Sequence, residues 1–257
     1  MHVFGLQLDI AWEDKPANFE QVNKLLADQR VPPGSLIVLP EMFSTGYSMN
    51  VAEIAEDAGR PAEAFLAQLA TRQQSFVIGG VVNRSGQGKG FNEALVLSPE
   101  GAELARYAKM QPMTVAGEMD HYHPGERTVN FRWGAWTVSP LICYDLRFPE
   151  LFREQVRRGA QLFAVIANFP GVREDHWLTL LEARAIENQA YVIGINRCGE
   201  DPNHHYTGRS VIFDPRGRLL ADAGNEPGVI HADLALPELE RYREMFPALK
   251  DMRPAEM

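Results

Sequence analysis

Three side chains with the chemistry of an acid, a cation and a nucleophile each stand at the end of an apolar segment of strand length. They are Glu41, Lys109 and Cys143. In open α/β sheets the residues of a site gather at the carboxyl ends of strands, so side chains distant in sequence can meet there. A thiol could then attack a carbonyl or nitrile carbon, a carboxylate could take its proton, and an ammonium could stabilise the oxyanion. Together the three residues point to acyl transfer.

Each residue also has an ordinary structural explanation. Glu41 could simply start a polar loop, Lys109 could be a solvated strand end, and a free cysteine is commonly a small buried hydrophobe. Cys143 differs because polar residues and then a helix follow it, and a helix N-terminus favours the thiolate. A Cys–His pair of Cys143 with His176 is an alternative, but the residues around the cysteine are unlike those of papain-type enzymes.

The three residues can meet only if the fold brings their strand ends together. Apolar runs of strand length and amphipathic segments of helix length alternate along the chain. The spacing predicts strands at 3–10, 35–39, 76–82, 104–109, 135–143, 162–167 and 191–196, and helices at 18–29, 62–73, 150–158, 176–188 and 237–243.

This pattern predicts an α/β fold with mixed sheets. Strands and helices alternate near both ends of the chain, and turns separate strands in the middle, at residues 86–90, 99–101 and 215–217. A single parallel Rossmann sheet would not need so many hairpin turns. No linker rich in Pro, Gly or Ser divides the chain, which predicts a single domain over residues 1–257.

Composition narrows the class of protein. The chain has 257 residues, 45% of them hydrophobic, which is ample for a continuous core. No apolar stretch reaches the roughly 20 residues needed to span a bilayer, and no signal peptide is readable. The net charge of -9 argues against nucleic acid as a partner. Two cysteines are no disulfide framework and favour the reducing cytoplasm. We expect a small molecule as partner.

Four sequence blocks resemble the nitrilase (carbon-nitrogen hydrolase) superfamily, in the order that this family has them. The similarity extends over essentially the whole chain, and within the superfamily it is greatest to omega-amidases of the short bacterial YafV-like type. The blocks are 39–43 (LPEMF), 107–109 (YAK), 141–150 (LICYDLRFPE) and 183–188 (ARAIEN).

The resemblance implies a four-layer α-β-β-α sandwich that forms a single carbon-nitrogen hydrolase domain, without a cofactor and paired as a homodimer. It also implies catalysis by Glu41, Lys109 and Cys143 through a thioester intermediate, with Glu118 holding Lys109. One departure lies directly after the lysine, where residues 110–113 read Met-Gln-Pro-Met instead of the His-Leu-Phe usual in relatives.

An omega-amidase removes the terminal amide of short dicarboxylate monoamides, such as 2-oxoglutaramate and 2-oxosuccinamate, and releases a 2-oxo acid and ammonia. The resemblance implies that Lys109 and the backbone N–H of Tyr144 receive the oxyanion. The distant substrate carboxylate needs a cation, for which Arg147 and Arg173 are both candidates, although each could instead form a structural ion pair.

Three aromatic residues could wall the pocket, although such residues are more often plain core. They are Phe43, Phe169 and Trp177. Two other activities would use the same three catalytic residues, namely those of an N-carbamoyl-amine amidohydrolase and an aliphatic nitrilase. A non-catalytic binding protein on this fold is a further alternative, which the presence of all three residues disfavours.

The remaining candidates carry weaker signals. The pairs His121 with His123 and His204 with His205 lack a third ligand at metal-binding spacing, so loop positions are favoured and no metal site is expected. Cys198 ends a strand without a partner motif, and we expect it to be structural.

Overall fold

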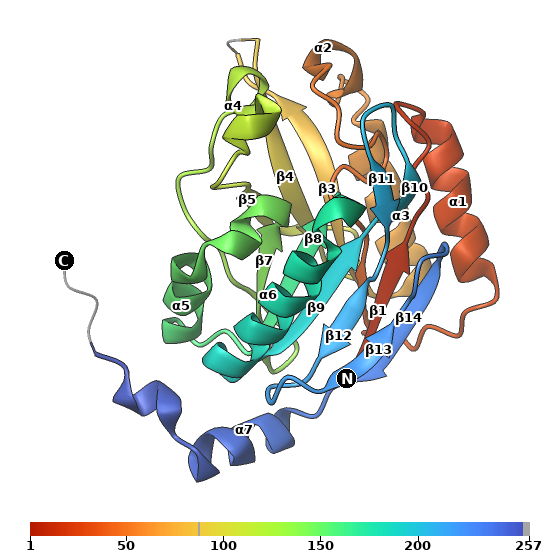
Figure 1. Ribbon diagram of the computed structural model, residues 1–257. Helices are drawn as coiled ribbons and strands as arrows, with labels where there is room; N and C mark the ends of the chain where they lie inside the picture. Colours follow the sequence, from red (N-terminus) through yellow and green to blue (C-terminus); the bar gives the residue numbers. More distant parts are fainter. Residues whose placement is uncertain (87, 254–257) are drawn as a thin grey trace.

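Two six-stranded sheets lie face to face in the computed structural model, which describes residues 1–86 and 88–253 (Figure 1). The first sheet has the strand order β14-β1-β2-β3-β4-β5, and the second has the order β13-β12-β9-β8-β7-β6. Within each sheet three consecutive strands are parallel, β1, β2 and β3 in one and β7, β8 and β9 in the other. Antiparallel strands complete both sheets, which confirms the prediction of mixed sheets.

The strands of the first sheet are β1 (His2–Gln7), β2 (Leu36–Val38), β3 (Phe76–Arg84), β4 (Gly90–Leu97), β5 (Glu103–Ala108) and β14 (Gly228–Asp233). Those of the second are β6 (Phe131–Trp133), β7 (Trp136–Ile142), β8 (Leu162–Ala167), β9 (Tyr191–Asn196), β12 (Val211–Phe213) and β13 (Leu219–Asp222). A separate hairpin consists of β10 (Cys198–Glu200) and β11 (His205–Thr207). The principal helices are α1 (Lys15–Ala27), α3 (Pro61–Gln73), α5 (Pro149–Arg157), α6 (Glu174–Asn188) and α7 (Leu236–Met245).

Alternating side chains of the strands build two hydrophobic layers. In β2, Leu36 and Val38 point into the core between the sheets, whereas Ile37 points to the opposite face, where α1 and α3 lie. On the outer face of the second sheet, α6 packs against β9 and α5 packs against α6. The arrangement is therefore the four-layer α-β-β-α sandwich that the family resemblance implies.

Local sequence sets where the helices begin. Asp14 caps α1 because its side chain accepts a hydrogen bond from the N–H of Ala17 at 3.0 Å. Pro61 and Pro149 begin α3 and α5, where the missing N–H of proline costs nothing. No helix in the described part of the chain is long and apolar enough to cross a membrane.

The sequence patterns missed several short elements and shifted some boundaries. Strand β14 was not expected, yet it pairs along all of β1 from the distant C-terminal region. The short hairpin β10–β11 and the one-turn helices α2 (Val51–Ile54) and α4 (Glu118–His121) were also missed, because such segments carry too few residues for a periodic pattern. Of the predicted turn at 86–90, Gln87 lies outside the described residues.

A glycine in β3 lets the end of β2 turn against its neighbour. The N–H of Gly80 donates to the carbonyl of Pro40 at 3.1 Å, and its carbonyl accepts from the N–H of Phe43 at 3.3 Å. A Cβ at position 80 would lie 2.6 Å from Cα of Glu41 and 2.3 Å from the backbone nitrogen of Met42. Only glycine therefore permits the close approach that places Glu41 at the edge of the sheet.

Candidate active site

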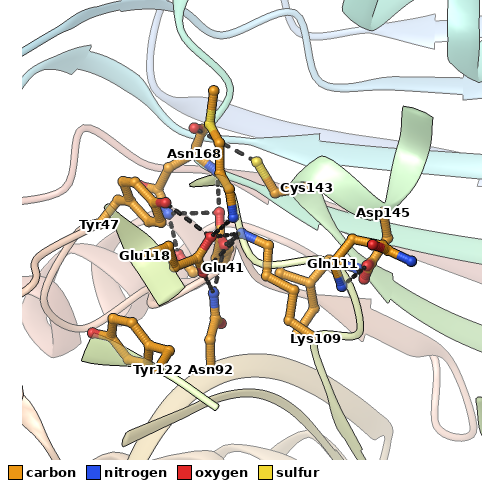
Figure 2. Close-up of polar contacts among 12 residues, drawn as sticks. Glu41, Tyr47, Asn92, Lys109, Gln111, Glu118, Tyr122, Cys143, Asp145 and Asn168 are labelled. Carbon is orange, nitrogen blue, oxygen red and sulfur yellow. Dashed lines mark hydrogen bonds and ion pairs between the residues drawn. The ribbon is translucent and has the colours of Figure 1, made fainter. Parts of the chain in front are cut away.

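Lys109 is the centre of a buried cluster of charged side chains (Figure 2). Its Nζ donates to Oε1 of Glu41 at 3.1 Å and to both carboxylate oxygens of Glu118 at 3.0 and 2.9 Å. Both glutamates are fully buried and Lys109 is 2% exposed. The Cys143 thiol lies beside this cluster, with Sγ 3.8 Å from the carbonyl oxygen of Asn168. The four residues predicted as catalytic thus come together from four separate segments.

Two asparagines fix the Glu41 carboxylate. Nδ2 of Asn92 donates to Oε1 at 2.7 Å, and the backbone N–H of Asn168 donates to Oε2 at 2.8 Å. Nδ2 of Asn168 also donates to the main-chain carbonyl of Glu41 at 2.7 Å. Because both carboxylate oxygens have directed donors, Glu41 is held in one orientation beside the thiol.

Glu118 accepts hydrogen bonds from four residues. Besides Lys109, the hydroxyl of Tyr47 donates to Oε2 at 3.0 Å, the N–H of Met113 donates to the same oxygen at 2.6 Å, and Nδ2 of Asn92 donates to Oε1 at 3.3 Å. Burial alone would raise the pKa of Glu118, but the Lys109 charge and these donors outweigh burial and lower it below its usual value. Glu118 is therefore a carboxylate that holds the ammonium in place.

Lys109 stays charged for the complementary reason. Burial alone would lower the pKa of the ammonium, but the charges of Glu41 and Glu118 raise it well above its usual value. A permanently charged donor is what an oxyanion site needs.

The thiol of Cys143 behaves differently from the expectation that a helix N-terminus favours the thiolate. Burial, and next the negative charge of Glu41, raise the pKa of Cys143 well above its usual value. The short 3-10 helix that starts at Cys143, η2 (Cys143–Arg147), does not offset these two effects. The thiol therefore requires a base, which is the role that the sequence predicts for Glu41.

The nucleophile candidate occupies a constrained backbone conformation. Cys143 has a φ of 47°, in the left-handed region that non-glycine residues rarely adopt, at a cost of about 1–3 kcal/mol. Strand β7 ends one residue earlier, so the turn directs the Cys143 side chain away from the strand. Arg184 supports η2 by donating to the carbonyl of Leu146 at 2.8 and 3.2 Å, and it also pairs with Glu187, three residues further along α6, at 2.9 Å.

A cavity of about 140 Å³ opens onto the thiol. Lys109 and Cys143 lie in its wall, and Glu41 and Glu118 lie buried behind it. The other lining residues combine aromatic, cationic and small apolar side chains; they are Tyr47, Met113, Val115, Ala116, Tyr144, Arg147, Asn168, Phe169, Pro170, Arg173 and His204.

Two of the residues expected to bind substrate lie outside this wall. Phe43 packs in the helix-side core, with its ring 5.9 Å from that of Phe65. Trp177 lies behind Phe169, at 5.2 Å between ring centroids, and its indole N–H donates to the carbonyl of Arg209 at 2.7 Å. The prediction that Phe43 and Trp177 wall the pocket is therefore wrong, because both are core residues; of the two, Trp177 packs behind the cavity-lining Phe169.

Four other expected residues do line the cavity, namely Tyr144, Arg147, Phe169 and Arg173. The Arg147 guanidinium lies 5.9 Å from the Tyr144 ring and 5.6 Å from the Phe169 ring, and it donates to Nδ1 of His176 at 3.2 Å. Neither Arg147 nor Arg173 forms an ion pair with a carboxylate within residues 1–86 and 88–253. The cavity wall thus carries two cations that are available to an anion.

Sequence reasoning missed Tyr47, Asn92 and Asn168. Asn168 directly follows β8, so the strand-end rule that singled out Glu41 could have found it. Asn92 lies within β4 and Tyr47 lies in a loop, and neither position carries a comparable signal.

The described histidines form neither the Cys–His pair nor a metal site. His176 contacts Arg147, whereas the carboxylate beside the thiol is Glu41, so the structure does not favour the Cys–His alternative. His123 contacts Ser85 at 3.1 Å, and His204 lies in the cavity wall. Among the described side chains, no group of three or more His, Cys, Asp or Glu residues could hold a metal ion.

Comparisons with known proteins agree with this fold and site. The family model described as carbon-nitrogen hydrolase matches residues 5–244. Omega-amidase YafV of Yersinia enterocolitica is 42% identical to this chain, and the match covers 96% of this chain and 94% of that relative. The 2-oxoglutaramate amidase of Bacillus subtilis is 33% identical, and the match covers 96% of each chain. The crystal structure of XC1258 from Xanthomonas campestris, a CN-hydrolase superfamily protein with an arsenic adduct in the active site, has a TM-score of 0.92 at 31% identity and covers 100% of this chain and 98% of its own.

The fold and the buried cluster define an enzyme of the α-β-β-α sandwich class that hydrolyses carbon-nitrogen bonds other than peptide bonds. The chain belongs to the carbon-nitrogen hydrolase family, as the sequence blocks predict.

The contact between Glu41 and Cys143 can be tested without substrate. Because the charge of Glu41 raises the pKa of the thiol, Glu41→Gln should shift the pH midpoint of Cys143 alkylation by iodoacetamide to lower pH. Peptide mapping after alkylation measures the reaction at this cysteine alone. Glu56→Gln, which removes a buried carboxylate paired with Lys15 outside the cavity, should leave the midpoint unchanged. An unshifted midpoint in Glu41→Gln would refute the contact.

Proposed function

We propose that this enzyme is an omega-amidase that hydrolyses the terminal amide of short dicarboxylate monoamides, 2-oxoglutaramate and 2-oxosuccinamate, to the 2-oxo acid and ammonia. The observation that carries the proposal is the cavity beside Cys143, which combines a thiol, an ammonium and two arginines free of carboxylate partners within the described chain. Relatives named omega-amidase and 2-oxoglutaramate amidase, similar over nearly the full chain, support the same activity.

In the proposed reaction Glu41 takes the thiol proton as Cys143 attacks the amide carbon. This order follows from the raised pKa of Cys143, since a protonated thiol is a weak nucleophile unless a base acts during attack. The amide C–N bond then breaks, and ammonia leaves with the proton that Glu41 returns. Water, activated by the same carboxylate, adds to the thioester carbon and releases the acid and the thiol.

The oxyanion formed in each step would be stabilised from two sides. The Lys109 ammonium lies in the cavity wall and is held there by Glu118. The backbone N–H of Tyr144 belongs to the first turn of η2, where N–H groups have no acceptor inside the helix. Each such donor is typically worth about 2.7–4 kcal/mol of transition-state stabilisation.

The distant carboxylate of the substrate would bind Arg147 or Arg173. A guanidinium presents paired donors that match a carboxylate, and the aromatic neighbours of Arg147 hold its plane. The cavity is small, about 140 Å³, which favours a short amide over a larger one.

The activity assay compares ammonia release from 2-oxoglutaramate, 2-oxosuccinamate, glutamine, an N-carbamoyl amine and an aliphatic nitrile. We expect the two oxo-monoamides to have the highest kcat/KM, and Cys143→Ala to abolish turnover while circular dichroism shows a folded protein. Faster turnover of the carbamoyl amine or the nitrile would replace the proposal by the corresponding alternative. Full activity of Cys143→Ala would refute the mechanism.

Substitution of each arginine tests carboxylate recognition. Arg147→Ala or Arg173→Ala should raise the KM for 2-oxoglutaramate by about 10- to 100-fold, the value of a lost charge-assisted hydrogen bond. The matched control is butyramide, a neutral amide, whose KM should change little in the same variants. If neither variant changes the KM for 2-oxoglutaramate, this part of the assignment fails.

We also propose that the enzyme is a homodimer in the cytoplasm. Met245 and Phe246, at the end of α7, are 73% and 59% exposed, which is typical of a surface that a second subunit covers. Both cysteines are free thiols, which suits a reducing compartment. Sedimentation equilibrium should give twice the mass of the chain, and a single-chain mass would disprove the dimer.

A further inference from the structure

Asp145 is a buried carboxylate that the proposed reaction does not use. It is fully buried two residues after Cys143, and three hydrogen bonds converge on it. The hydroxyl of Tyr107 donates to Oδ2 at 2.8 Å, the N–H of Ile142 donates to Oδ2 at 3.0 Å, and the N–H of Gln111 donates to Oδ1 at 2.9 Å. Figure 2 shows the contact with Gln111 beside the main cluster.

The donors come from both sides of the site. Tyr107 and Gln111 flank Lys109 in the sequence, one at the end of β5 and one in the segment that follows it. Ile142 is the last residue of β7 and directly precedes Cys143. One carboxylate therefore joins the segment that carries the ammonium to the turn that carries the thiol, although these belong to different sheets.

We infer that Asp145, oriented by Tyr107, is a positioning residue that sets the distance between the Cys143 thiol and the Lys109 ammonium, and that it does so as a carboxylate. The inference deepens the proposed function, because it rests on Cys143 as nucleophile and Lys109 as oxyanion donor. Asp145 touches neither the cavity nor the reacting atoms, so it acts only through the backbone and the Tyr107 hydroxyl.

The chemistry of the three partners favours the ionised form. Two are backbone N–H groups, which can only donate, and a carboxylate has lone pairs for all three donors. Protonation of Asp145 would force the Tyr107 hydroxyl to turn from donor to acceptor, because the new O–H must donate and the two N–H groups cannot accept. Replacement by asparagine would place an NH2 group against at least one donor, so at least one bond of the cross-link breaks. The left-handed turn at Cys143 then loses a support that its strained backbone needs.

Asp145 titrates within the working range of an enzyme. Burial raises its pKa to about 7, against the hydrogen bond of Tyr107, the charge of Lys109 and the N–H groups of Ile142 and Gln111, all of which lower it. The titratable groups that face it are Tyr107 and Lys109 from the β5 side, with the Cys143 thiol on its own turn. Loss of the Tyr107 hydroxyl therefore raises the pKa of Asp145 further.

The first test compares Asp145→Asn with Asp214→Asn. Asp214 is also buried and accepts two backbone N–H bonds, but it lies in the β12–β13 hairpin away from the cavity. We expect Asp145→Asn to lower kcat for 2-oxoglutaramate by about 10- to 100-fold, the effect of misplaced reacting groups, with KM changed less than about twofold. The second-order rate of Cys143 alkylation should fall in parallel. Asp214→Asn should keep both rates at temperatures where it is folded.

The second test uses Tyr107→Phe, which keeps the ring and removes only the hydroxyl. Without that donor the rise of kcat with pH on the acid side should move to higher pH, because ionised Asp145 then requires a higher pH. Tyr191→Phe, at a buried tyrosine in β9, should leave the acid side of the kcat profile in place. If Asp145 acts as a carboxylate, kcat of Tyr107→Phe should recover towards the wild-type value as the pH rises, whereas kcat of Asp145→Asn should not. General destabilisation would not produce this difference between the two variants.

An unchanged acid limb in Tyr107→Phe, or wild-type kcat in folded Asp145→Asn, would overturn the inference. If Asp145→Asn does not fold, the Tyr107→Phe profile alone decides. The alkylation measurements need no amide substrate. Absence of 2-oxoglutaramate hydrolysis by the wild-type enzyme would therefore refute the proposed function, while the alkylation rates of Asp145→Asn and Asp214→Asn would still test the role of Asp145.

Discussion

The site depends on one ammonium that two buried carboxylates share. Burying a charge without a partner costs several kcal/mol, and Lys109 is the cation that both fully buried glutamates contact. Lys109 in turn keeps its proton because both carboxylates contact it. The three side chains are therefore interdependent, and the cluster leaves one net negative charge facing the thiol. Burial, and next the negative charge of Glu41, raise the pKa of Cys143, which makes Glu41 the natural acceptor of its proton.

The sandwich explains how four segments deliver this cluster. Strands β2 and β7 belong to different sheets, yet both end at the same edge, and each ends in a tight turn. The turn after β2 requires Gly80 to admit the backbone of Glu41, and the turn after β7 places Cys143 in a left-handed conformation. Packing between the sheets thus fixes the site, while the loops supply the cavity wall.

The sequence was informative where a physical rule singles out a position. Apolar strands that end in Glu41, Lys109 and Cys143 obey the strand-end rule, and the long helices follow their apolar periodicity. Asn92 could not be found in this way, because an asparagine within β4 resembles any polar residue of a strand until Glu41 lies opposite it. Phe43 and Trp177 were misplaced because aromatic side chains in core and pocket look alike in sequence. Only the packing around each ring separates the two.

Recognition of an anion by an acidic protein follows from local charge. The chain has a net charge of -9, so its overall field does not attract a dicarboxylate monoamide. Around the cavity the local charge is positive, although the whole chain is negative. Glu41 and Glu118 lie behind the cavity wall, and Lys109 screens their charge. The guanidinium groups of Arg147 and Arg173 lie in the wall itself. Specificity for a carboxylate would then come from short-range donors, and it would tolerate salt better than long-range steering does.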